Sequence, residues 1–545
     1  MVPAHRFLRA WLCSCLLVTI FAQVAVGMEN ATPAPGGDET VVTDAGPIRG
    51  MNEDGYRLFQ GIPFAAPPVG ELRWQSPQPV EPWTAPRDAT APGNWCVQPD
   101  EGPGSLGGGS EDCLYLNVTV PATASVEHPL PVMVWIHGGG FISGAGSIFD
   151  ARRLAVQGDA VVVTVNYRLG IFGFFGLEEL PNAGTFGLED QIAALQWVQR
   201  NAAAFGGDPD NVTLFGESAG GLSTCALLAS PMAEDLFHRA IVQSGACTID
   251  WPNDGIFVGA EAGSLWGSIA TLNELGNAVT ASVGCDAASN RLACLRQTAA
   301  DDLMAIPLVM AYGRVSYGND VLPENPAEVM RAAGALPVPV MMGITRDEGR
   351  TFVSFDPEPI TDARFAALLG KAFGDGAAAV EQAYPLSVHA SPGLAWAAAM
   401  TDRVWACPTL ENLELLATET TVYAYEFADR DAPSLFPFPP DLPGGAYHGS
   451  EILSLFDLPI PGFDPGMTAE QLELADAMVA YWSNFAHQGD PNGDGLPTWE
   501  PFTTIDSPPF VQSLAPGPDG VRPIDFAARH QCAFWATVEE APPAS

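Results

Sequence analysis

Residues 205–221 read Phe-Gly-Gly-Asp-Pro-Asp-Asn-Val-Thr-Leu-Phe-Gly-Glu-Ser-Ala-Gly-Gly. The apolar run at 212–215 is typical of a buried strand, and the small residues after Ser218 can begin a helix. A strand, a G-x-S-x-G turn and a helix in this order predict a nucleophile elbow, which exposes the serine hydroxyl. Gly216 and Gly220 permit so sharp a turn because they lack a Cβ. We therefore interpret the chain as a serine hydrolase with Ser218 as its nucleophile.

Length and composition bound the fold: the chain could form two or three average domains, and α/β folds also reach this size as one unit. The chain has 545 residues, of which 47% are hydrophobic, so it can bury a large core. Its formal net charge of -41 reflects 23 basic residues against 64 acidic ones. A surface of this sign repels nucleic acid and anionic membranes, and we expect neither as a partner. If this charge steers substrates at all, it favours neutral or cationic ones.

The N-terminus has the plan of a signal peptide. Arg6 and Arg9 precede an apolar run at 11–22, and small residues follow up to Gly27. This run is too short to span a bilayer comfortably, and the sequence has no longer one. We predict export to the periplasm or the medium after cleavage near Gly27, without stable membrane association. The predicted organisation is a signal peptide at 1–27, a flexible segment at 28–40, one domain at 41–537 and a flexible tail at 538–545.

The ten cysteines suit an oxidising compartment. Two lie in the predicted signal peptide, and Cys225 and Cys247 stand among apolar or small residues, so we interpret the latter two as buried free thiols. No cysteine and histidine cluster has zinc spacing, and a run at 490–495 that resembles a calcium loop lacks its final glutamate. We therefore expect no bound metal. Two local pairs suggest disulfides, Cys96–Cys113 and Cys285–Cys294, and a Cys407–Cys532 disulfide would join the C-terminus to the body of the protein.

Apolar runs and helical patterns alternate along the chain. A helical pattern at 188–204 lies between two apolar runs, and 250–335 and 360–420 are mainly helical and loop-like. Alternation of this kind predicts a mostly parallel sheet with helices on both faces, and we expect the two helical segments to cover its C-terminal edge. The predicted strands lie at 114–118, 132–136, 160–165, 212–215, 240–244, 339–343 and 422–427.

A serine nucleophile needs a histidine to take its proton and a carboxylate to hold that histidine. Among the five histidines after Ser218, His448 lies in a Gly/Ala loop just before a helical stretch, where its ring has room to face a cleft. Glu348 follows the end of a predicted strand, where ligand-facing loops of open sheets emerge. The neighbouring Asp347 is the alternative acid.

A glycine-rich loop predicts the third part of the site. The strand at 132–136 leads into His137-Gly-Gly-Gly-Phe141. Consecutive glycines let backbone N–H groups approach a carbonyl oxygen, which is the role of an H-G-G-G loop. We predict that the amides of Gly139, Gly140 and Ala219 form an oxyanion hole. Each such donor typically lowers the barrier by roughly 3 kcal/mol.

At this point the chain resembles the type-B carboxylesterases, the family that includes cholinesterases and fungal lipases. The resemblance covers about 41–535 and implies an α/β-hydrolase fold. It implies Glu348 rather than Asp347 as the acid through a matching D-E-G, His448 through a matching H-G-x-E, and the three disulfides above. Besides the elbow and the glycine loop, it rests on Gln60-Gly-Ile-Pro-Phe64, Glu111-Asp-Cys-Leu-Tyr-Leu-Asn117, Asn166-Tyr-Arg-Leu-Gly170 and Gly187-Leu-Glu-Asp-Gln191.

The resemblance also suggests roles for four further residues. Glu217, Ser244 and Glu451 would be polar groups around the triad, and Trp251 would be a wall of the acyl pocket. We predict a secreted serine esterase that cleaves small-molecule esters through an acyl-enzyme, without metal or cofactor. The alternatives are a lipase activated at interfaces and a non-catalytic adhesion member of the same fold. The sequence carries no prediction of oligomeric state.

Overall fold

The computed structural model describes residues 39–100, 102, 104–306, 309–459 and 464–538. The predicted signal peptide, residues 28–38 of the predicted flexible segment and residues 539–545 of the predicted tail lie outside this part. The first strand begins at Glu39, two residues ahead of the predicted start of the domain. No helix in the described ranges is long and apolar enough to cross a membrane.

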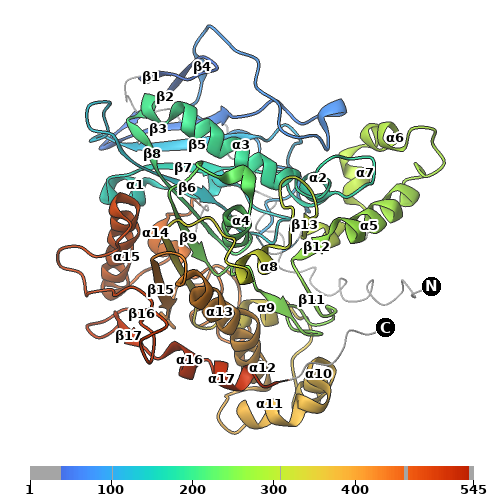
Figure 1. Cartoon of the computed structure of the whole chain (residues 1–545), viewed down its shortest axis with the longest axis vertical. Coiled ribbons are helices and arrows are strands. Elements are labelled where there is room, and N and C mark those ends of the chain that lie inside the picture. The colour runs from blue at the N-terminus through green and yellow to red at the C-terminus, as the bar shows by residue number, and fades with distance from the viewer. Residues whose placement is uncertain (1–38, 101, 103, 307–308, 460–463, 539–545) are drawn as a thin grey trace.

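A sheet of 13 strands runs through the described part of the chain (Figure 1). Its order is β1-β2-β3-β5-β7-β6-β8-β9-β14-β15-β16-β17, with β4 beside β2. Neighbours from β7 to β16 are parallel, whereas the pairs at both edges, except β2 with β4, are antiparallel. The strands are β1 (Glu39–Val42), β2 (Pro47–Glu53), β3 (Tyr56–Pro63), β4 (Arg87–Asp88), β5 (Tyr115–Pro121), β6 (Leu130–Ile136), β7 (Val161–Val165), β8 (Gly207–Glu217), β9 (Arg239–Gln243), β14 (Val340–Thr345), β15 (Val422–Phe427), β16 (Val511–Leu514) and β17 (Arg522–Ile524).

The central strands are apolar throughout because both faces of the sheet are covered. Successive side chains of a strand point to opposite faces. In β6, Val132, Val134 and Ile136 join one hydrophobic core, whereas Met133 and Trp135 join another. The continuous apolar runs in the sequence therefore predicted the central parallel strands correctly.

Helices form a layer on each face of the sheet (Figure 1). Helices α3, α4 and α13 pack on one face, and α1 and α15 pack on the other. Further helices come from the two segments predicted to be helical. The helices are α1 (Arg152–Gly158), α2 (Gly170–Phe174), α3 (Phe186–Asn201), α4 (Ala219–Leu228), α5 (Ile269–Ser282), α6 (Arg291–Gln297), α7 (Ala300–Met304), α8 (Pro326–Arg331), α9 (Gly349–Ser354), α10 (Asp362–Phe373), α11 (Ala377–Ala383), α12 (Pro392–Met400), α13 (Cys407–Leu416), α14 (Ile452–Leu455), α15 (Ala469–Gln488), α16 (Phe526–Arg529) and α17 (Cys532–Trp535).

The segment 250–335 also contains short strands that the sequence did not predict. β10 (Asp250–Trp251) pairs with β11 (Gly263–Ser264), and β12 (Trp266–Ser268) pairs with β13 (Val315–Tyr317). Each has only two or three residues, which is too short to give an alternating pattern.

One cysteine prediction is wrong. Cys225 and Cys247 are bonded to each other and are not free thiols. Strands β8 and β9 are parallel neighbours, so the helix that follows β8 passes the loop that follows β9. This brings the two Cα atoms to 5.5 Å, a normal separation for a disulfide. The structure also pairs Cys96 with Cys113, Cys285 with Cys294, and Cys407 with Cys532.

Candidate active site

Ser218 stands at the sharp turn between β8 and α4. Its backbone has φ 57° and ψ -120°, a strained conformation for a residue with a side chain. Its N–H donates to the Gln243 carbonyl at 2.9 Å, and its own carbonyl accepts from Leu222 at 2.8 Å. A Cβ on Gly220 would lie 1.9 Å from the Ile136 carbonyl oxygen, so only glycine fits there. Ser218 is partly exposed between buried neighbours, as an elbow serine should be.

Glu348 and His448 meet although they are 100 residues apart. Glu348 is buried beyond the end of β14, and its Oε2 lies 2.5 Å from His448 Nδ1. Its Oε1 accepts from the Thr345 N–H at 2.9 Å and from the Ser244 hydroxyl at 2.6 Å. These contacts fix the carboxylate and direct the Nδ1 hydrogen of the imidazole toward it. Ser244, one of the suggested polar neighbours, therefore contacts the predicted acid Glu348 directly.

The other imidazole nitrogen remains open. His448 Nε2 lies 3.3 Å from Glu217 Oε1 and has no hydrogen-bond partner within the described ranges. Glu217 directly precedes Ser218, so this nitrogen faces the elbow. The arrangement leaves Nε2 available to exchange a proton with a group beside Ser218.

Three buried carboxyl groups surround the His448 ring. Burial alone would lower the pKa of His448, but Glu348 and then Glu217 raise it to about 9. Burial raises the pKa of Glu217 to about 7, although His448 opposes this shift. Burial, Glu217 and Glu348 raise the pKa of Glu451 to about 8. Glu451 also accepts a hydrogen bond from Gln243 at 3.2 Å. Negative charge here therefore stabilises a protonated imidazole, the form that follows proton transfer from a nucleophile.

The glycine loop after β6 lies against the elbow. A Cβ on Gly138 would lie 3.1 Å from the Ser218 Cβ. Gly139 and Gly140 have φ of 105° and 61°, a region that favours glycine. Ala219 is the first residue of α4. The predicted donors thus belong to two segments that adjoin Ser218: Gly139 and Gly140 follow Gly138 in the glycine loop, and Ala219 begins α4.

His137, at the start of this loop, is not a second base. Its buried ring stacks on Tyr167 with centroids 4.4 Å apart, and Nδ1 lies 2.8 Å from the Gly138 carbonyl. Burial lowers the pKa of His137 to about 4, so the ring stays neutral. The Tyr167 hydroxyl donates to the His137 carbonyl at 2.9 Å and so holds the start of the glycine loop in place.

Comparisons with known proteins agree with this geometry. The model of the carboxylesterase family matches residues 37–535. The chain belongs to the carboxylesterase family. It is 34% identical to human cocaine esterase over 91% of both chains, and 35% identical to para-nitrobenzyl esterase of Bacillus subtilis over 84% of this chain and 91% of that one. A solved thermophilic PNB esterase superposes with a TM-score of 0.73 at 32% identity and covers 91% of this chain and 99% of its own. The protein is a carboxylic ester hydrolase with an α/β-hydrolase fold.

Two aromatic rings that the sequence did not single out contact His448 in this esterase. The centroid of Phe352 lies 4.9 Å and that of Trp405 4.7 Å from the imidazole, and the two rings stack on each other. The predicted acyl-pocket residue Trp251 is buried and donates to the Glu261 carbonyl at 3.0 Å. Phe352 lies one helical turn after Glu348, a spacing that could have identified it.

Asp347, the alternative acid, serves a different partner. Arg430 donates to both of its carboxylate oxygens, from Nε at 3.0 Å and from Nη2 at 2.6 Å. Such a bidentate contact occupies the carboxylate. Glu348 is therefore the carboxylate that the esterase presents to His448.

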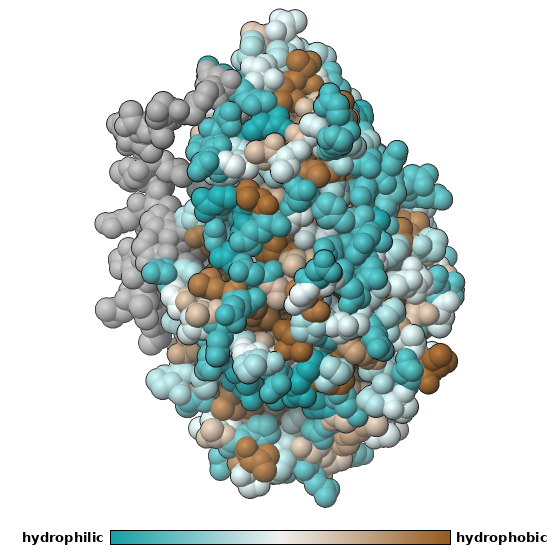
Figure 2. Space-filling model, turned by 90° about the vertical axis from the view of Figure 1, so that its left-hand side faces the viewer, coloured by the Kyte–Doolittle hydropathy of each residue, from teal (hydrophilic) through white to brown (hydrophobic). Residues whose placement is uncertain are grey.

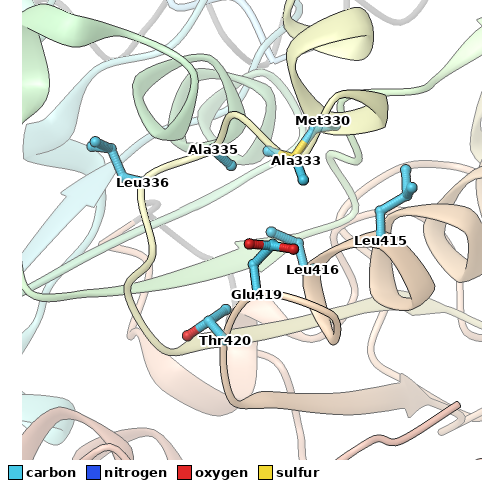
Figure 3. Close-up of a pocket in the computed structure, with 8 residues that line it drawn as sticks. All are labelled: Met330, Ala333, Ala335, Leu336, Leu415, Leu416, Glu419 and Thr420. Carbon is cyan, nitrogen blue, oxygen red and sulfur yellow. The ribbon is translucent and has the colours of Figure 1, made fainter.

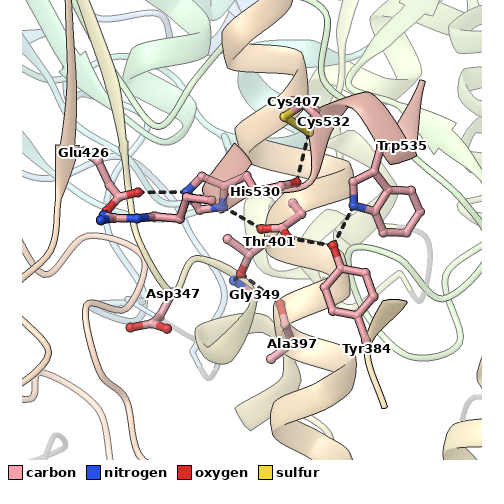
Figure 4. Close-up of polar contacts among 12 residues, drawn as sticks. Asp347, Gly349, Tyr384, Ala397, Thr401, Cys407, Glu426, His530, Cys532 and Trp535 are labelled. Atoms are coloured by element: carbon pink, nitrogen blue, oxygen red, sulfur yellow. Dashed lines mark hydrogen bonds and ion pairs between the residues drawn. A yellow bond between two sulfur atoms is a disulfide. The ribbon is translucent and has the colours of Figure 1, made fainter. Parts of the chain in front are cut away.

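A second buried histidine stands outside this site (Figure 4). His530 Nδ1 lies 2.5 Å from Asp402 Oδ1, and Nε2 lies 2.8 Å from Glu426 Oε2. Next to Asp402, the Thr401 hydroxyl accepts from the Gly349 N–H at 2.9 Å. Burial would lower the pKa of His530, but hydrogen bonds to Asp402 and Glu426 raise it to about 9. The sequence did not predict this cluster.

Other surface features of the esterase lie apart from these residues. A hollow between α8 and α13 has a volume of about 10 Å³, room for roughly one water molecule (Figure 3). The face in Figure 2 is largely hydrophilic, with hydrophobic residues in small separate patches. Within the described ranges, no group of three or more potential ligands could hold a metal ion. The hollow is lined by Met330, Ala333, Ala335, Leu336, Leu415, Leu416, Glu419 and Thr420.

Proposed function

We propose that Ser218, His448 and Glu348 form the catalytic triad of this esterase. The contact between Glu348 and His448 carries the proposal, because it orients an imidazole whose Nε2 is open beside the elbow. His448 Nε2 takes the Ser218 proton while the hydroxyl oxygen attacks the ester carbonyl. The amides of Gly139, Gly140 and Ala219 donate to the oxyanion that forms.

The reaction then proceeds in two halves. The tetrahedral intermediate breaks its bond to the alcohol oxygen, which receives the proton from His448 and leaves. Water next attacks the acyl-enzyme and gives its proton to His448, and the second intermediate releases the acid as Ser218 recovers its proton. Glu348 stabilises the imidazolium in both halves, and no metal or cofactor takes part.

We infer a substrate class from the surroundings of His448. Phe352 and Trp405 offer an apolar wall, and the carboxyl groups of Glu348 and Glu217 beside the ring disfavour a second negative charge. Two relatives are named for cocaine and para-nitrobenzyl esters. We infer that this esterase prefers small neutral esters with an apolar or aromatic group and disfavours anionic ones. A p-nitrophenyl ester series of increasing acyl length, with a succinate monoester as the anionic member, measures this preference.

The same proposal includes export. Four disulfides suit an oxidising compartment. Cleavage near Gly27 would leave the first strand, at Glu39, intact. We expect the protein recovered outside the cytoplasm to begin near residue 28. N-terminal sequencing measures this.

The decisive test compares two serines of the same segment. Ser218→Ala should reduce p-nitrophenyl acetate turnover by about 10⁴-fold or more and abolish labelling by a fluorophosphonate. Ser223→Ala, a buried serine of α4 that accepts from Gln191, is the matched control and should keep both activities. Substantial turnover by a folded Ser218→Ala protein would rule out the assigned nucleophile.

A further inference from the structure

Asp347 makes the hydrogen bonds that connect the turn carrying Glu348 to the loop carrying His448. The Asp347 N–H donates to the Ala446 carbonyl at 2.8 Å, and the Ala446 N–H donates to Asp347 Oδ2 at 3.1 Å. Asp347 immediately precedes Glu348, and Ala446 lies two residues before His448. Asp347 therefore joins the two chain segments that must meet for the acid to contact the base.

Two arginines complete this junction. Besides the bidentate contact from Arg430, Arg350 Nη2 lies 2.9 Å from Asp347 Oδ1. Arg350 Nη1 also donates to the Pro443 carbonyl at 2.8 Å, at the start of the same loop. The Asp347 side chain is only 6% exposed, so these contacts form with little competition from water. We call Asp347, Arg350 and Arg430 the Asp347 clamp.

The loop packs tightly on the clamp at Gly445. Gly445 has φ 63°, and a Cβ there would lie 2.5 Å from Asp347 Oδ2 and 2.7 Å from Arg350 Nη1. The chain passes directly over the ion pairs at a position that only glycine fits. The loop therefore has a defined position relative to the Glu348 turn before it reaches His448.

We propose that the Asp347 clamp is a positioning device for the triad, which sets the distance between Glu348 and His448 without contacting the substrate. The inference rests on the proposed triad. Its physical reason is that acid and base lie on separate loops, and a displacement of about 1 Å can cost 10²-fold in rate. A buried ion pair that only stabilised the fold would not need to join these two particular loops.

The first test replaces the charge and keeps the shape. Asp347→Asn should lower kcat for p-nitrophenyl acetate by about 10- to 100-fold and change KM by less than about threefold, because the ester-binding wall is untouched. The acid limb of kcat/KM should also move to lower pH, because a looser Glu348 raises the pKa of His448 less. Glu217 and Glu451, the other carboxyl groups facing that ring, stay in place.

Glu111→Gln is the matched control. Glu111 is a shielded carboxylate bound in the same bidentate way by Arg73, at 2.5 and 2.6 Å. Its loss should lower the melting temperature while kcat per active site, counted by fluorophosphonate titration, stays within twofold. Equal effects of both variants on kcat and on the pH profile would overturn the proposal and leave Asp347 a purely structural residue.

A second variant covers failure of Asp347→Asn to fold. The Arg430 side chain is 50% exposed, so Arg430→Gln removes the bidentate partner with less disturbance of the core. It should lower kcat by a smaller factor than Asp347→Asn does. An unchanged kcat would contradict the proposed positioning role of the clamp. Failure of the proposed triad looks different, since Ser218→Ala would then retain turnover whatever the Asp347 variants do.

Discussion

Two buried histidines of this esterase, His448 and His530, have nearly identical partners on one ring nitrogen. Each Nδ1 lies 2.5 Å from a carboxylate oxygen, of Glu348 in one case and of Asp402 in the other. Each ring has a pKa raised to about 9 against the effect of burial. Charge and burial alone therefore do not distinguish the proposed catalytic histidine from the other one.

The second ring nitrogen separates them. His530 Nε2 is bound to Glu426 at 2.8 Å, and Arg529 pairs with the same Glu426. His448 Nε2 has no hydrogen-bond partner in the described part of the chain and faces the residue before Ser218. A saturated imidazolium joins elements together, whereas an imidazole with one open nitrogen can transfer a proton.

The two clusters are nevertheless connected. Asp402 lies in the π-helical segment Thr401–Ala406, which also carries Thr401 against Gly349 and Trp405 against His448. Segments of this kind are often found at functional sites. The His530 cluster thus supports one wall of the candidate active site from behind.

Replacing each histidine by asparagine should give opposite phenotypes, the largest difference expected. His448→Asn should reduce kcat by about 10⁴-fold or more with little loss of stability. His530→Asn should change kcat by only a few-fold, since no reacting group touches it. Steady-state kinetics and thermal melts on both variants measure this. If His530→Asn were as inactive as His448→Asn while still folded, the distinction drawn from Nε2 would be wrong.

The stability of His530→Asn should depend on pH in a defined direction. Because the folded pKa of His530 is raised to about 9 from 6.5, its protonation stabilises the fold fully below about pH 6.5 and loses that effect as pH rises through 9. The difference in unfolding free energy between wild type and variant should shrink by about 3 kcal/mol from pH 6 to pH 10. Urea titrations at both pH values test this, and a difference that grows with pH contradicts it.

Removing one carboxylate from each cluster should move the pH profile in only one case. Glu217 raises the pKa of His448, so Glu217→Gln should shift the acid limb of kcat/KM to lower pH by about one unit. Glu426→Gln removes the equivalent charge beside His530 and should leave that limb in place. A shift to higher pH in Glu217→Gln would show that Glu217 does not act on the base as the structure indicates.

The parts of the site that sequence predicted are those encoded by contiguous residues. The elbow around Ser218 and the glycine loop at 137–141 each depend on local backbone requirements, so their patterns are complete within a few residues. Parallel strands were likewise visible as apolar runs. The acid and the base are less clearly encoded. Their local sequence leaves Asp347 as an alternative to Glu348, and only the family resemblance favours Glu348.

What the sequence did not reveal depends on which segments become neighbours. Cys225 and Cys247 look like small apolar residues until β8 and β9 pair. His530 contacts Asp402 and Glu426, which lie more than 100 positions earlier in the chain. Such contacts leave no local spacing to detect, because their partners are set by sheet order rather than by helical or strand periodicity.

The smallest expected contrast concerns the aromatic rings beside the two imidazoles. Phe352 lies 4.9 Å from His448, and Phe526 lies 4.6 Å from His530. Such a ring contact contributes about 0.5–1.5 kcal/mol beyond its buried area. At His448 this should appear in kinetics, so Phe352→Leu should change kcat/KM for an aromatic ester roughly two- to tenfold with little effect on melting. At His530 the same loss should lower the melting temperature of Phe526→Leu and leave kcat/KM unchanged, because an imidazole bound to carboxylates at both nitrogens has no open nitrogen for a substrate. Identical effects of the two substitutions on kcat/KM would contradict this contrast. They would mean that the His530 cluster affects catalysis through the Thr401–Ala406 segment.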